Sequence, residues 1–97
     1  MMTKELMKMI HKSAIEEYGM DNQVIVTIEE LSELQKELTK ILRDEGSISR
    51  LIEEIADVEI MLSQVKEMFA LKDEDLEKMK VKKTARLLDR LLKDRKV

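Results

Sequence analysis

Hydrophobic residues recur every three or four positions along most of the chain, which is the spacing of one face of an α-helix. Gly19 and Gly46 interrupt this pattern, and glycine readily ends a helix because it tolerates a left-handed backbone. A third interruption precedes Asp73, whose side chain can cap a helix. The sequence therefore predicts four helices, over residues 3–18, 21–46, 49–71 and 73–96, with Asp21 or Asn22 capping the second and Ser47 or Ser49 capping the third.

The third predicted helix is the most hydrophobic of the four, and its apolar residues spread beyond a single stripe. Such a helix is buried on more than one side, so we expect it at the centre of the fold. Because the connections are short, neighbouring helices should run antiparallel. We expect an all-α, four-helix antiparallel bundle formed by residues 1–97 as one domain. The apolar residues of the fourth helix should face inward: Leu76, Met79, Leu87, Leu88, Leu91 and Leu92.

One acidic pattern occurs twice, in the second and third predicted helices. Residues 28–34 read IEELSEL, and residues 52–58 read IEEIADV. At about 100° per residue, Glu30 and Glu33 lie about 60° apart at the edge of an apolar stripe, and Glu54 and Asp57 do the same on the next helix. Antiparallel packing through the two stripes would bring all four carboxylates to one edge. The stripes are Leu31, Leu34, Leu38 and Ile41, and Ile55, Val58 and Leu62.

Four carboxylates held this close repel one another strongly unless a cation lies among them. An all-oxygen site suits a hard cation, Mg²⁺ first and Mn²⁺ second. The alternative is a solvated face, because 40% of the residues are charged and acids at helical spacing commonly form salt links. Met61 and Met68 share the angular sector of Glu54 and Asp57, which is a poor neighbourhood for solvated acids. The repetition of the motif therefore favours a metal site.

The composition excludes several other classes of protein. Without Cys, the chain can form neither disulfides nor Cys-based zinc sites, and this fits a reducing, cytoplasmic environment. Its only histidine, His11, cannot supply the two histidines of a four-helix di-iron site. A formal net charge of −3 argues against nucleic-acid binding. The first residues mix charge with apolar side chains, and no apolar run is long enough for an expected membrane span.

The two acidic motifs resemble the E-E-x-x-E and E-x-x-D signature of the MazG-like all-α nucleoside triphosphate pyrophosphohydrolases, a family that includes dimeric dUTPases and dCTPases. Residues 18–23 and the basic fourth helix extend the similarity over most of the chain. Family members hydrolyse a nucleoside triphosphate to the monophosphate and pyrophosphate, and they work as homodimers or homotetramers that complete the active site across an interface. The resemblance implies this activity, this substrate class, Mg²⁺ and a homo-oligomer for the present chain.

The resemblance also implies roles for individual residues. Similar Lys and Arg positions contact phosphate in the family, and here Lys80, Lys83 and Arg86 are spaced to project along one side of the fourth helix. A Lys-rich helix can equally be a solvated face that balances acids elsewhere in the fold. Gln23 and Asn22 match a region that touches the base or ribose in some relatives, although Asn22 is equally a helix cap. The implied Mg²⁺ ligands are Glu30, Glu33, Glu54 and Asp57, with Glu29 and Glu53 as outer acids.

The expected reaction is attack of water at the α-phosphorus, which requires neutralised phosphate charge and a more acidic water. A carboxylate that is not fully engaged with metal can take the proton from the water, and Glu33 or Glu29 is the candidate. A different class of function remains open. The chain can equally be a non-catalytic helical interaction or regulatory module that keeps the acidic pattern, in which case Mg²⁺ would hardly affect its stability.

Overall fold

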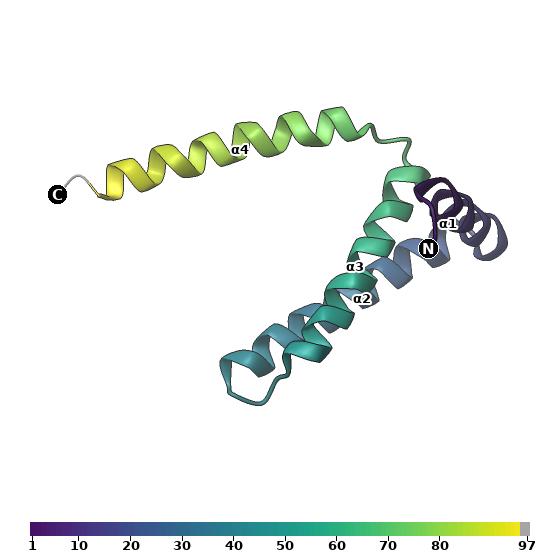
Figure 1. The fold of residues 1–97 in the computed structure, drawn as a ribbon, viewed down its shortest axis with the longest axis horizontal. Helices are drawn as coiled ribbons and strands as arrows, with labels where there is room; N and C mark the ends of the chain where they lie inside the picture. The colour runs from purple at the N-terminus through teal and green to yellow at the C-terminus, as the bar shows by residue number, and fades with distance from the viewer. Residues whose placement is uncertain (96–97) are drawn as a thin grey trace.

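The computed structural model describes residues 1–95 and consists of helices and short connections (Figure 1). The all-α prediction is confirmed. Thr3 caps the first helix by accepting a hydrogen bond from the Leu6 amide at 3.1 Å, and Ser47 caps the third by accepting from the Arg50 amide at 3.0 Å. The expected end of the fourth helix at residue 96 lies outside the described residues. The helices are α1 (Lys4–Tyr18), α2 (Met20–Leu42), α3 (Ile48–Met68) and α4 (Asp73–Asp94).

Two of the expected caps are wrong. Gly19, with φ of 87°, both ends α1 and stands at the start of α2, so α2 begins before Asp21 and Asn22. The side-chain amide of Asn22 instead donates to the Tyr18 carbonyl at 2.8 Å. Asp73 is the first residue of α4, and Lys72 stands at the cap position. The Asp73 carboxylate accepts a hydrogen bond from Lys66 Nζ at 3.0 Å.

Helices α2 and α3 form an antiparallel hairpin, and α1 packs against both of them near the α2 start (Figure 1). The side chains between α2 and α3 follow alternating steps of three and four residues, the spacing of a coiled-coil seam. This seam is strongly polar. Its buried residues are Gln23, Thr27 and Glu37 on α2 with Val58, Met61 and Gln64 on α3.

The polar seam changes the packing that the sequence indicated. Leu31, Leu38, Ile55 and Leu62 were expected between the helices, but all four are exposed. Each of them follows a seam position by one residue, so it is turned by about 100° out of the interface. The prediction is right for Val58, which is buried, and for Leu34 and Ile41, which are half-buried at seam positions. It is wrong for the other four, because the seam also takes in Gln23, Thr27 and Glu37 and so is turned away from Leu31 and Leu38.

The far end of the hairpin is fixed by a buried carboxylate. Glu37 accepts a hydrogen bond from the Ser47 amide at 3.1 Å, which ties the connection to α2. Gly46 leaves room for this arrangement, because a Cβ there would lie 2.7 Å from Glu37 Oε2 and 2.8 Å from the Ile41 nitrogen. The loop therefore packs tightly against α2 and holds the two acidic motifs in register.

Helix α4 departs from the expected bundle. In the described part of the chain it packs against none of the other helices, and it extends away from the end of α3 (Figure 1). All of its residues are exposed, so the side chains expected to face inward pack against no other helix of residues 1–95. The radius of gyration is 17.1 Å, compared with about 13 Å for a compact domain of this length. The packed part of the fold is therefore α1 to α3.

The sequence analysis expected no membrane-spanning segment, and the length and hydropathy of the helices can be compared with this expectation. Among residues 1–95, none of the helices combines the length and the apolar character that crossing a bilayer requires.

Candidate metal centre

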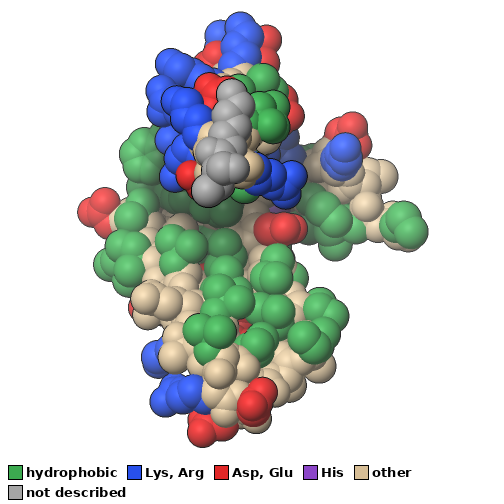
Figure 2. Space-filling view, turned by 90° about the vertical axis from the view of Figure 1, so that its left-hand side faces the viewer, with side chains coloured by type: hydrophobic (Ala, Val, Ile, Leu, Met, Phe, Trp, Pro, Cys, Tyr) green, Lys and Arg blue, Asp and Glu red, His purple; other side chains and the backbone are tan. Residues whose placement is uncertain are grey.

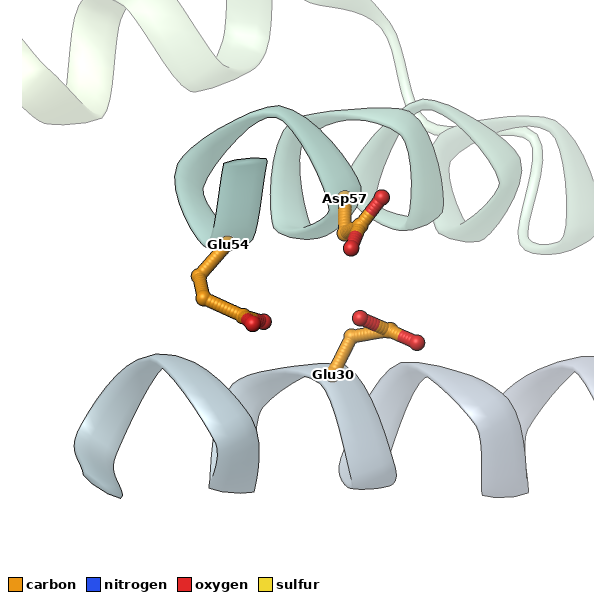
Figure 3. Close-up of side chains that lie close together, drawn as sticks. All are labelled: Glu30, Glu54 and Asp57. Atoms are coloured by element: carbon orange, nitrogen blue, oxygen red, sulfur yellow. The ribbon is translucent and has the colours of Figure 1, made fainter. Parts of the chain in front are cut away.

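Three of the predicted acids converge across the hairpin. Glu30 projects from α2 toward Glu54 and Asp57, which project from α3 (Figure 3). One carboxylate oxygen from each of the three lies within 4.8 Å of the others. Both sequence motifs contribute, so the antiparallel pairing of the two helices creates the cluster.

The position of each acid follows from the seam. Glu30 and Glu54 occupy seam positions, because each lies four residues before the next seam residue of its helix, Leu34 and Val58 respectively. Both acids are half-buried. Asp57 precedes Val58 by one residue, so it lies at the edge of the seam and is exposed. The cluster therefore has two partly shielded carboxylates and one carboxylate that faces solvent.

The electrostatics of the cluster disfavour its fully ionised form. The pKa of Glu30 is raised above its ordinary value, first by burial and then by the charge of Asp57, by a hydrogen bond with Asp57, and by the charges of Glu54 and Glu33. Within residues 1–95, none of the three clustered carboxylates forms a salt bridge with a Lys or Arg. A bound cation would relieve this repulsion directly.

The donor set fits a hard divalent cation. All three donors are carboxylate oxygens, which Mg²⁺ and Mn²⁺ prefer. An octahedral Mg²⁺ with bonds of about 2.1 Å holds its ligand oxygens about 3 to 4.2 Å apart. Small rotations of the side chains would bring the present oxygens into that range. Three protein ligands also leave positions for water and phosphate, as is usual for Mg²⁺ sites.

The remaining predicted acids lie around this cluster and not in it. Glu33 is exposed, and its carboxylate lies 3.6 Å from Lys36 Nζ, although its charge still raises the pKa of Glu30. Glu29 and Glu53 are exposed as well. Each precedes a seam acid by one residue, so both turn toward the same side as Asp57. The roles of Glu33 as a ligand and of Glu33 or Glu29 as a base stay predictions.

The predicted phosphate contacts are not near the cluster within one chain. Lys80, Lys83 and Arg86 lie on α4, which extends away from the hairpin (Figure 1). Lys80 Nζ lies 4.0 Å from Glu77 of the same helix. A contact between these cations and phosphate at Glu30, Glu54 and Asp57 therefore requires α4 from another chain or a movement of α4, and it stays a prediction.

The two predicted nucleoside-binding residues differ in accessibility. Asn22 is exposed, whereas Gln23 is buried and donates a hydrogen bond to the Gln64 side chain across the seam. The sequence analysis did not foresee this amide pair. The alternating steps of four and three residues at positions 23, 27, 30, 34, 37 and 41 would have placed Gln23 in the interface. Contact between Gln23 and a nucleoside would need the pair to open.

Comparison of the chain with protein-family models, curated proteins and solved structures finds no match. The resemblance to MazG-like enzymes therefore rests on the two acidic motifs and on their context in the sequence.

Proposed function

We propose that this protein is a Mg²⁺-dependent nucleoside triphosphate pyrophosphohydrolase of the MazG-like kind. It would hydrolyse a nucleoside or deoxynucleoside triphosphate to the monophosphate and pyrophosphate by attack of water at the α-phosphorus. The observation that carries this proposal is the meeting of Glu30, Glu54 and Asp57 across two helices, with their oxygens within 4.8 Å. The resemblance of the two motifs to the family signature supplies the reaction.

The acids on the open side of the hairpin have distinct tasks in this proposal. Glu30, Glu54 and Asp57 hold Mg²⁺, which when bound neutralises phosphate charge and makes a coordinated water more acidic. Glu33 and Glu29 lie beside the cluster and are exposed, so either can accept a proton from the attacking water. Mn²⁺ has the same preference for oxygen ligands and is expected to substitute.

The direct test is release of pyrophosphate from a panel of ribo- and deoxyribonucleoside triphosphates, with Mg²⁺ and with EDTA. Glu54→Gln removes one ligand charge, while Glu59→Gln removes an exposed charge from the same helix outside the cluster. We expect release that requires Mg²⁺, is lost in Glu54→Gln and persists in Glu59→Gln. If folded protein at saturating Mg²⁺ turned over none of the triphosphates, the proposed activity would be rejected.

The large exposed apolar surface favours a second candidate, a helical module that acts by binding another protein chain. Ile28, Leu31 and Leu38 are all exposed on α2, and monomeric proteins seldom expose contiguous apolar surface without a binding role. For such a module without catalysis, Mg²⁺ should leave the unfolding free energy unchanged. The enzyme should instead gain stability with Mg²⁺, because the cation binds only the folded state.

A further inference from the structure

Positive charge is concentrated at one end of the chain. Residues 78–97 contain nine of the 18 Lys and Arg residues but two of the 21 Asp and Glu residues. The formal net charge of −3, which argued against nucleic-acid binding, is therefore an average over a long acidic region and a short basic one. Because nucleic-acid binding requires Lys and Arg in excess on one surface, the charge of the basic region decides the question.

Most of the basic region belongs to α4, whose start is acidic. The acids at the start are Asp73, Glu74, Asp75 and Glu77. Lys80 belongs to this end, because its Nζ lies 4.0 Å from the Glu77 carboxylate. Lys83 lies six residues beyond Glu77, or about 9 Å along the helix, which exceeds the screening length of about 8 Å at physiological salt. The cations from Lys83 onward are therefore largely independent of the acidic start.

Four of these cations share one side of α4. At about 100° per residue they fall within an arc of about 80°, and together with Asp89 they line one open hollow on the helix. All four are exposed, and within residues 1–95 none of them forms a salt bridge. Figure 2 shows Lys and Arg side chains gathered on α4. We call this group the basic strip, and it consists of Lys83, Arg86, Arg90 and Lys93.

The basic strip lies opposite the apolar side of α4. Leu88 is turned by about 180° from the centre of the strip, and Val81 and Leu92 lie within about 40° of Leu88. Any surface that covers the apolar side therefore leaves the strip open. The same geometry disfavours a membrane as the partner, because an interfacial helix buries its apolar side in the bilayer. The strip would then point toward water and away from the lipid headgroups.

We propose that the basic strip binds the phosphate backbone of a nucleic-acid duplex without reading its sequence. The four cations extend over about 15 Å of helix, and a B-form duplex carries roughly nine phosphate charges in that length. Lys and Arg are the usual partners of these phosphates. A duplex fits better than a single strand, because single strands are held by stacking on aromatic side chains and α4 contains no aromatic residue.

The acidic body of the protein does not occupy the strip. Helix α4 extends away from the hairpin and packs against none of the other helices of residues 1–95 (Figure 1). The inference is also separate from the proposed activity. Lys83 and Arg86 are predicted contacts of the substrate phosphates, but Arg90 and Lys93 have no part in that reaction. Variants of Arg90 and Lys93 therefore test duplex binding by itself.

Fluorescence anisotropy of a labelled mixed-sequence DNA duplex, measured with the full chain in EDTA at increasing KCl, tests the proposal. Four phosphate contacts predict that log K falls with log salt at a slope of about −3.6. The double variant Arg90→Gln/Lys93→Gln should lose about 1.8 of that slope and bind more than about tenfold more weakly at roughly 0.05 M KCl. The matched control Arg43→Gln/Arg50→Gln removes the same charge from exposed residues of the hairpin and should bind like the wild type.

Two results would overturn the proposal: no binding of the duplex by the folded wild type at low salt, or equal weakening in both double variants. Sedimentation with anionic phosphatidylserine vesicles tests the lipid alternative. Binding to vesicles that Leu88→Gln abolishes, without binding to the duplex, would assign α4 to a membrane surface and also overturn the proposal. Pyrophosphate release should be the same in Arg90→Gln/Lys93→Gln as in the wild type, so the proposed activity and duplex binding can fail independently.

Discussion

The α2–α3 hairpin and α4 are built from amphipathic helices of nearly equal length, yet they use their apolar residues in different ways. The hairpin packs through a seam that contains Gln23, Thr27 and Glu37, and it leaves leucines and isoleucines outside. Helix α4 has a simpler apolar side and packs it against no helix of residues 1–95. In the hairpin, polar residues thus occupy an interface that apolar residues could have filled.

The difference shows that hydrophobic periodicity predicts where helices lie in the sequence more readily than it predicts which surfaces they pack against. A polar seam costs stability unless its groups are satisfied. The hairpin seam includes Glu30 and Glu54, the half-buried acids of the candidate metal centre, together with the Gln23–Gln64 pair. The proposed metal site would explain why acids lie between the two helices.

The largest effect should come from the small apolar part of the seam. Only Val58 and Met61 are buried hydrophobic residues in the described chain, so Met61→Ala is expected to lower the free energy of unfolding by about 2–4 kcal/mol. Met79→Ala removes the same atoms from α4, where the side chain is 48% exposed, and should cost less than about 0.5 kcal/mol in dilute protein. Urea unfolding measures both, and equal losses would contradict the contrast between the regions.

The amide pair across the seam should give the next largest effect. Gln64→Leu leaves the buried Gln23 amide without its partner and should cost about 1–3 kcal/mol. Adding Gln23→Leu should recover most of that loss, because an apolar pair of similar shape needs no hydrogen bond. A double-mutant cycle by urea unfolding checks this. Additive losses in the double variant would show that the two amides do not stabilise each other.

The acidic cluster predicts a specific dependence of stability on pH. Since the pKa of Glu30 is raised, mainly by burial and Asp57, folding favours its protonated form. Protonated Glu30 therefore stabilises the fold at pH values below the ordinary Glu pKa of 4.5, and this stabilisation is lost as the pH rises through the raised pKa of Glu30. In EDTA near neutral pH, Glu30→Gln should therefore be more stable than wild type, by a few tenths to about 1 kcal/mol.

With bound metal, Glu30→Gln should become less stable than the wild type instead of more stable. At saturating Mg²⁺, the wild type gains stability from binding and Glu30→Gln gains little, whereas Glu59→Gln should follow the wild type in both conditions. Urea unfolding between roughly pH 4 and 8, with EDTA and with Mg²⁺, measures these differences. If Glu30→Gln were less stable than wild type in EDTA at neutral pH, repulsion within the cluster would be excluded.

The smallest effect concerns the start of α4. The hydrogen bond and charge of Lys66 lower the pKa of Asp73, so this pair stabilises the fold above the ordinary pKa of Asp73 and less as the pH falls through the lowered value. In Lys66→Met, the pKa of Asp73, followed by NMR of its carboxyl carbon, should return toward 3.8. An unchanged pKa would show that Lys66 does not fix the connection to α4.

Much of the fold could be predicted from the sequence, namely the parts that depend on residues close together in the chain. Gly19, Thr3 and Ser47 act through backbone geometry and neighbouring amides, so the helices and several ends were predictable. The position of α4, away from the other helices of residues 1–95, was not predictable, because its apolar residues carry no information about which surface they pack on. The seam was predicted only in part, at Leu34, Ile41 and Val58, because Leu31 and Leu38 outweigh Gln23 and Thr27 in hydrophobicity, although Gln23 and Thr27 are the buried ones.

The candidate site was predictable to a similar degree. The repeat of the acidic motif was enough to bring Glu30, Glu54 and Asp57 together once two helices paired antiparallel. Glu33 was expected in the same cluster because it lies one turn from Glu30, but with Glu30 in the seam that turn carries Glu33 to the exposed edge beside Lys36. The rotation of a helix about its own axis is set by tertiary packing, which a single stripe does not determine.

Binding of Mn²⁺, followed by electron paramagnetic resonance as the free ion disappears, tests the central claim that α2 and α3 hold a divalent cation between them. The account predicts saturable binding to the wild type that Mg²⁺ displaces, that Glu54→Gln and Asp57→Asn each lose, and that Glu59→Gln retains. Absence of binding to the folded wild type, or equal binding to all four proteins, would contradict it.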